Sequence, residues 1–128
     1  MSIWFISAAM IFMHIIDDYV LQAACLCNLK QKSFWEKNAP DVIYKCDYIW
    51  ALLMHGFSWA FMVMLPIAFV HSFNVGSAFI CVLTLNAFIH ALIDDAKANL
   101  NLINLCTDQV CHIMQIAGTL ILFNIGII

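Results

Sequence analysis

Histidines and aspartates four residues apart occur at three places in the chain. The three pairs are His14 with Asp18, His90 with Asp94, and Asp108 with His112. Residues four apart in an α-helix lie on one face, so each pair can offer an imidazole nitrogen and a carboxylate oxygen to a single ion. Three such pairs in a chain with only five histidines and eight acidic residues predict a metal site.

Other polar residues of the same segments extend the predicted site. His55 is a further intramembrane histidine, so the expected metal ligands are His14, Asp18, His55, His90, Asp94, Asp108 and His112. Asp17 and Asp95 each adjoin a ligand, and we expect one of them to act as a general base or to orient a ligand. Lys97 either neutralises an anionic substrate or pairs with an aspartate.

The number and type of these residues limit the ion. Four imidazoles and several carboxylates exceed the four ligands of a closed zinc site, so either some orient ligands or two ions are bound. Nitrogen and oxygen ligands together suit zinc, manganese or iron, with zinc as the default divalent ion. The alternative without metal is a network of interhelical salt bridges and hydrogen bonds, which also holds membrane bundles together.

The composition indicates that lipid surrounds the elements that carry these pairs. Of the 128 residues, 65% are hydrophobic and 10% are charged, and the mean hydropathy is +0.94. We expect one domain over residues 1–128, an all-α integral membrane four-helix bundle. The predicted spans cover about 2–27, 48–70, 75–93 and 110–128, and the predicted cytoplasmic loop is 28–47.

The lysines orient the predicted spans. All five follow the first or the third span, namely Lys30, Lys32, Lys37, Lys45 and Lys97. Four crossings put them on one side, which the positive-inside rule makes the cytoplasm. We therefore expect a multi-pass protein of the inner (plasma) membrane, with both termini on the non-cytoplasmic side and the three pairs at the cytoplasmic helix ends. With no arginine and a net charge of −3, nucleic acid is excluded as a partner.

Two longer motifs carry a resemblance to a known family. They are His14-Ile-Ile-Asp-Asp-Tyr-Val-Leu-Gln22 and His90-Ala-Leu-Ile-Asp94 with Lys97. The chain resembles an uncharacterised family of small bacterial and phage membrane proteins with the signatures H-x-x-x-D-[FY]-x-L-Q and H-x-x-x-D-x-x-K. That family is similar to membrane-bound metal-dependent hydrolases of the YdjM type and, more remotely, to the zinc-dependent phospholipase C and P1-nuclease group. The resemblance implies hydrolysis of a phosphoester or related bond.

The leading functional hypothesis is a metal-dependent hydrolase that acts on a phosphoester or lipid-linked substrate at the cytoplasmic face. Two alternatives stay open. One is a metal or proton transport component, which at this size would need a homo-oligomer and a polar path across the membrane. The other is a non-catalytic membrane scaffold, stabilised by metal in a closed coordination shell, that binds a partner through the loop 28–47.

Overall fold

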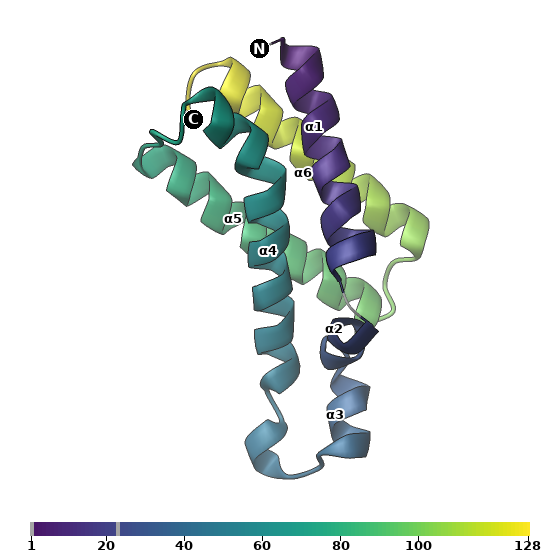
Figure 1. Ribbon diagram of the computed structural model, residues 1–128. Helices are drawn as coiled ribbons and strands as arrows, with labels where there is room; N and C mark the ends of the chain where they lie inside the picture. Colours follow the sequence, from purple (N-terminus) through teal and green to yellow (C-terminus); the bar gives the residue numbers. More distant parts are fainter. Residues whose placement is uncertain (1, 23) are drawn as a thin grey trace.

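The computed structural model describes residues 2–22 and 24–128, which form six α-helices, a π-helix and a 3₁₀ turn, with no strand among them. In chain order the elements are α1 (Ile3–Ile16), the π-helix η1 (Asp17–Leu21), α2 (Ala24–Leu29), α3 (Lys32–Asn38), the 3₁₀ turn η2 (Val42–Tyr44), α4 (Asp47–Val70), α5 (Ser77–Ala98) and α6 (Leu105–Asn124). The prediction of an all-α four-helix bundle is confirmed, with α1, α4, α5 and α6 as its long helices (Figure 1).

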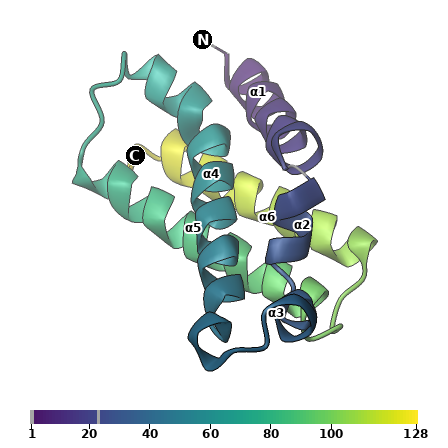
Figure 2. The ribbon, with the colours of Figure 1, turned by 60° about the horizontal axis from the view of Figure 1, so that its bottom comes forward.

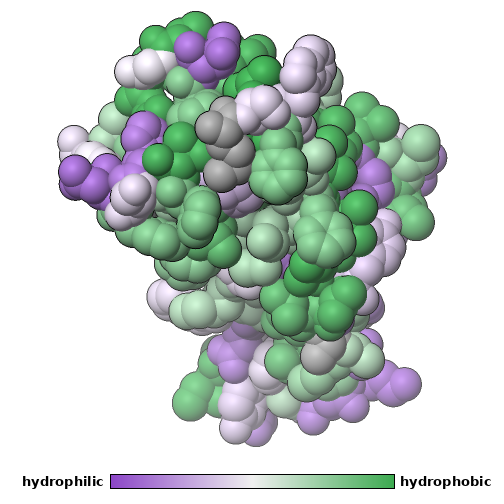
Figure 3. Space-filling view, turned by 45° about the horizontal axis from the view of Figure 1, so that its top comes forward, coloured by the Kyte–Doolittle hydropathy of each residue, from purple (hydrophilic) through white to green (hydrophobic). Residues whose placement is uncertain are grey.

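Four helical segments of the described chain are long and apolar enough to cross a membrane, which indicates a membrane protein. They are Ile3–Leu21, Val42–Val70, Ser77–Ala98 and Leu105–Asn124. Large apolar side chains such as Trp4, Phe12 and Leu92 point outward from these segments. The space-filling view in Figure 3 shows a mainly hydrophobic face with hydrophilic residues around its edges and at its lower end. Such a surface suits contact with lipid.

The helix α4 forms the centre of the bundle. It packs against α1 on one side and α5 on the other, and α6 closes the bundle against α1 and α5. Its side chains Trp59, Val63, Met64 and Ile67 are fully buried. Figures 1 and 2 place both chain termini at one end of the bundle, and α2 and α3 at the other. Residues near the ends of α1 and α5 and near the start of α6 therefore meet at the end that carries α2 and α3.

The helix boundaries differ from the predicted spans in three of the four long helices. The third predicted span ends at 93, but α5 continues to Ala98, and α6 ends at Asn124 instead of 128. The first helix does not continue to residue 27, because Gln22 has ψ 89° and the chain starts the separate helix α2 afterwards. The last helix begins at Leu105, because the side chain of Asn104 caps it by accepting from the Thr107 N–H at 2.9 Å. The predicted span 110–128 left out Asp108, yet this residue is fully buried inside the bundle.

Gly56 allows the closest approach of two helices. A Cβ atom at this position would lie 2.4 Å from the backbone oxygen of Ala87 and 3.3 Å from the Cβ of Ala91. Only glycine permits such contact between α4 and α5, as small residues generally do at membrane helix interfaces. The contact sets the spacing of His55 and His90, whose ring centroids are 5.0 Å apart.

We predict that Gly56→Ala lowers stability by about 1–3 kcal/mol, because the added methyl group must push α4 away from a rigid backbone carbonyl. The measurement is the midpoint of thermal unfolding in detergent. Gly118→Ala in α6 is the matched control, because a Cβ there would meet no atom within 4 Å. An unchanged midpoint for the Gly56 variant would contradict the close approach.

Candidate metal site

Six histidine and aspartate side chains from all four long helical segments converge at the end of the bundle that carries α2 and α3. We call them the His/Asp cluster: Asp18, His55, His90, Asp94, Asp108 and His112. His90 and His112 are fully buried, and Asp18, the most exposed of the six, has 10% of its side chain accessible. The cluster therefore lies in the bundle interior, where ionisable groups need partners.

The first ligand group gathers around His55. Its Nε2 atom lies 3.4 Å from Asp18 Oδ1 and 3.5 Å from Asp94 Oδ2. The Nε2 atom of His90 lies 4.0 Å from the same Asp18 oxygen and 3.8 Å from the same Asp94 oxygen. Ligands about 2.1 Å from a tetrahedral ion are about 3.4 Å from one another. These separations are close to those of a tetrahedral site.

A second ligand group adjoins the first. The Nε2 atom of His112 lies 3.6 Å from Asp94 Oδ1 and 3.4 Å from Asp108 Oδ1. His90, Asp94 and His112 can together offer one atom each to an ion. Asp94 therefore faces the first group with one carboxylate oxygen and the second group with the other.

Several buried atoms of the cluster have no hydrogen-bond partner among the described residues. They are Asp18 Oδ1, His55 Nε2, His90 Nδ1, His90 Nε2, Asp108 Oδ1, His112 Nδ1 and His112 Nε2. Buried polar atoms are nearly always hydrogen-bonded, so a set of unsatisfied atoms that face one another requires an explanation. Most of them are the atoms that line the two ligand groups, so the residues present fit a bound cation.

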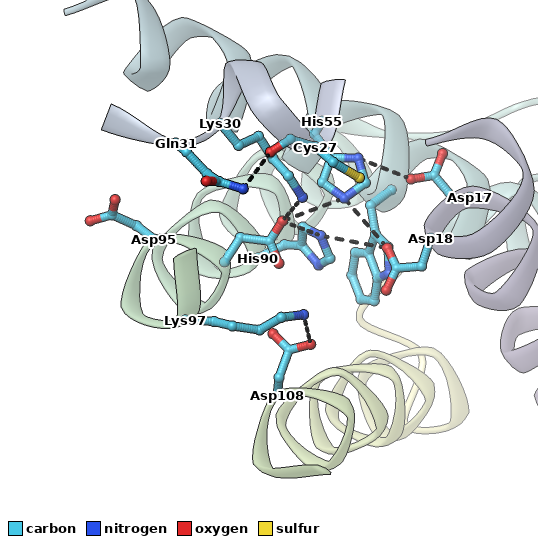
Figure 4. A network of polar contacts seen from close by, with 12 residues as sticks. Asp17, Asp18, Cys27, Lys30, Gln31, His55, His90, Asp95, Lys97 and Asp108 are labelled. Carbon is cyan, nitrogen blue, oxygen red and sulfur yellow. Dashed lines mark hydrogen bonds and ion pairs between the residues drawn. The ribbon is translucent and has the colours of Figure 1, made fainter. Parts of the chain in front are cut away.

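The π-helix η1 brings two consecutive aspartates to one imidazole. Asp17 Oδ2 lies 3.5 Å from His55 Nδ1, while Asp18 Oδ1 faces His55 Nε2, as Figure 4 shows. Successive side chains of an α-helix point about 100° apart, and the wider π turn makes the angle between neighbouring side chains smaller. Asp17 is fully buried and accepts a 2.6 Å hydrogen bond from Ser58 Oγ. It is therefore placed to orient His55, as carboxylates behind histidine ligands do.

His14 lies beside the cluster but outside both ligand groups. Its Nδ1 accepts a 2.8 Å hydrogen bond from the indole N–H of Trp59, and its Nε2 lies 3.1 Å from Gln109 Oε1. With Nδ1 as acceptor, the ring proton is on Nε2 and donates to Gln109. Both nitrogens are thus engaged in hydrogen bonds, and the predicted ligand role of His14 stays a prediction.

Asp95 does not face the cluster, although the sequence made it a candidate for catalysis. Figure 4 shows its carboxylate pointing away from His90. It accepts a 2.7 Å hydrogen bond from Asn99 Nδ2, and Asn99 also bonds the backbone of Lys30 and Lys32. Residues one apart on an α-helix point in different directions, so Asp94 and Asp95 cannot both face the interior. Asp95 instead helps to attach the α2–α3 segment to the end of α5.

Two lysines pair with cluster aspartates. Lys30, which the sequence indicated only as a loop cation, is 7% exposed, and its Nζ lies 2.5 Å from Asp94 Oδ2. Lys97 Nζ lies 2.6 Å from Asp108 Oδ2, in agreement with one of the two roles predicted for it. Lysines after a span are ordinary topology signals, and nothing in the spacing of Lys30 marks it as a site residue.

Sequence reasoning also missed Trp59 as a part of the site. Its ring stacks on His90 with centroids 4.4 Å apart, and His90 stacks on His112 at 4.2 Å. The indole therefore closes the cluster toward the apolar core while its N–H holds His14. Its position four residues after His55 was the available signal.

Comparisons of the chain with protein-family models, with curated proteins and with solved structures find no match. The site is consequently described by its own residues. These buried histidines and aspartates could hold a metal ion.

We predict that Trp59→Phe lowers the stability of the metal-free protein by about 1–3 kcal/mol, because buried His14 Nδ1 loses its donor while an aromatic ring remains. Thermal unfolding in the presence of a chelator measures this effect. Trp4→Phe is the control, since Trp4 is 82% exposed. Equal midpoints for the two variants would show that the indole hydrogen bond contributes nothing.

Proposed function

We propose that the protein is a metal-dependent membrane hydrolase with a two-ion centre, in which zinc is the default ion. The observation that carries this proposal is the placement of Asp94, whose two oxygens face different ligand groups. Hydrolytic two-metal sites hold their ions about 3.5–4 Å apart, and Asp94 is the residue that could contribute an oxygen to each of two ions. His55, His90 and Asp18 would hold one ion, and His112 and Asp108 the other.

Divalent ions bound here would supply Lewis acidity and an activated water for attack on an ester. The protein's own residues do the rest. Asp17 orients His55 through Nδ1 and leaves Nε2 free to act as a ligand. Trp59 and the apolar core of α4 close the cluster on the side of the chain termini, so the substrate enters from the end that carries α2 and α3. Asp17 therefore acts in this proposal as the positioning residue and not as the base.

The substrate class in this proposal is a phosphoester or a lipid-linked compound at the cytoplasmic face of the inner (plasma) membrane. The lysines support the orientation, because all five follow the first and third spans. The two motifs resemble an uncharacterised family of small membrane proteins, and the similarity of that family to YdjM-type hydrolases supports the reaction class. Next to the cluster on the side of the termini, Asn86 hydrogen-bonds with Thr119 and Gln115. Beyond these residues the core is apolar, with Met10, Val63 and Ile67 fully buried. A core without a continuous polar path favours a hydrolase over a transport component.

We predict that the purified wild-type protein carries two transition-metal ions per chain, and that Asp94→Asn retains at most one, because the amide cannot provide two charged ligand atoms. Elemental analysis after removal of loosely bound metal gives the stoichiometry. The matched control is Asp95→Asn, which changes the neighbouring carboxylate outside the cluster and should retain both ions.

The same measurement on Asp18→Ala, His90→Ala and His112→Ala separates the two ligand groups. The Asp18 variant should bind the first ion more weakly, and the His112 variant should bind the second more weakly. The His90 variant should bind the first ion or both ions more weakly. A wild-type protein without stoichiometric metal contradicts the proposal. Hydrolysis assays with phosphomonoester and lipid-pyrophosphate substrates follow, and a metal-loaded protein that turns over none of them would favour the scaffold alternative.

The orientation has its own test. We expect a reporter that is active only outside the cytoplasm, such as alkaline phosphatase, to be active when it is fused after Ile128, because both termini lie at the end without lysines. The same reporter inserted after Asn38 in the α2–α3 segment should be inactive. The reverse pattern would place the site on the non-cytoplasmic side.

A further inference from the structure

A pocket opens beside the His/Asp cluster. Its volume is about 390 Å³, and its polar lining residues are Asp18, Gln22, Lys30, Gln31, Asp94 and Lys97. This volume is in the range of small-molecule sites. Asp18 and Asp94 belong to the ligand groups, so the pocket gives a ligand direct access to the cluster.

The two lysines of this pocket form ion pairs with different aspartates of the cluster. Lys30 lies in the turn directly after α2 and contacts Asp94, whereas Lys97 lies on α5 and contacts Asp108. Lys30 is also held by Gln22: with its side-chain amide oxygen turned toward the lysine, Gln22 accepts from Lys30 Nζ and donates to the Asp18 backbone oxygen at 3.1 Å. Two ammonium groups, one from the turn after α2 and one from α5, thus lie at one pocket.

A metal ion would change the partners of these lysines unequally. Lys97 binds Asp108 Oδ2, while the other oxygen, Oδ1, faces His112, so Lys97 can stay in place. Lys30 binds Asp94 Oδ2, the same oxygen that faces the first ligand group. A divalent ion there would share that oxygen and repel the ammonium group. Lys30 would then need another anion within the pocket.

The charges around the pocket indicate what that anion is. Four aspartates, with Asp17 included, face two lysines and leave two negative charges when the imidazoles are neutral. Two divalent ions reverse this balance to two positive charges. Uncompensated charge at membrane depth is costly. A dianionic group of tetrahedral oxygens would neutralise the site and could accept hydrogen bonds from both lysines.

We infer that Lys30 and Lys97 form the binding site for a phosphate-type dianion, either the terminal phosphate of a lipid headgroup or a free phosphate group. This inference rests on the proposed function, because the anion is required only when metal is bound. It adds to that function the residues that recognise the substrate, one of which belongs to the segment between the first two spans.

The test is isothermal titration calorimetry of the full-length, zinc-loaded protein in detergent. One arm uses inorganic phosphate and the other uses short-chain phosphatidic acid. We expect wild type to bind, Lys30→Gln and Lys97→Gln each to bind about tenfold more weakly, and Lys97→Arg to bind nearly as well as wild type. Lys37→Gln is the control, because Lys37 is exposed on α3 outside the pocket.

The outcomes separate this inference from the proposed function, because the zinc content of every sample is measured first. Zinc-loaded protein that binds neither probe, or that binds them equally well in both glutamine variants, overturns the phosphate site and leaves the metal centre intact. Wild type without zinc overturns both. Binding of both probes supports recognition of the phosphate group alone, and binding only of phosphatidic acid supports a lipid headgroup. Lys97 is partly exposed, so its variant tests the site even where Lys30→Gln fails to fold.

Discussion

The carboxylates at one end of this bundle cannot remain charged in apolar surroundings without cationic or hydrogen-bonding partners. Each partner comes from a different part of the chain. Asp17 accepts a hydrogen bond from Ser58. Asp94 forms an ion pair with Lys30, and Asp108 forms one with Lys97. The need to satisfy these groups therefore ties η1, the turn after α2, α4, α5 and α6 together at the same level. Beyond the buried hydrogen bond from Asn86 to Thr119, apolar packing holds the opposite half. Metal binding would satisfy most of the imidazole and carboxylate atoms of the cluster that have no hydrogen-bond partner in the described part of the chain.

The sequence could predict the helices and most of the cluster, because both depend on short-range spacing. Residues four apart share a helix face, so all three predicted pairs follow from the sequence and lie together in the structure: His14 with Asp18, His90 with Asp94, and Asp108 with His112. Apolar runs of about 20 residues likewise identify the four long helices. Interior placement of the paired residues follows from the energetic cost of facing lipid.

Contacts between distant segments could not be predicted from spacing. The role of His14, as a metal ligand or as a partner in hydrogen bonds, depends on Trp59 and Gln109, which are 45 and 95 residues away in the sequence. Lys30 reaches Asp94 only because Asn99 attaches the α2–α3 segment to the end of α5. Asp94 and Asp95 are chemically identical in the sequence, and only the rotation of α5 about its axis decides which of them faces the interior.

The π-helix at Asp17–Leu21 has a consequence for how such a site can arise and be lost. A π turn is equivalent to one residue added to an α-helix. Deletion of a single residue between Asp17 and Leu21 would restore the α-helical register. The residues before and after the deletion would then be rotated by about 100° relative to each other about the helix axis. The span would remain long enough for the membrane. A sequence one residue shorter here could therefore keep its hydropathy profile and its topology, yet lose the arrangement in which two neighbouring carboxylates hold one imidazole.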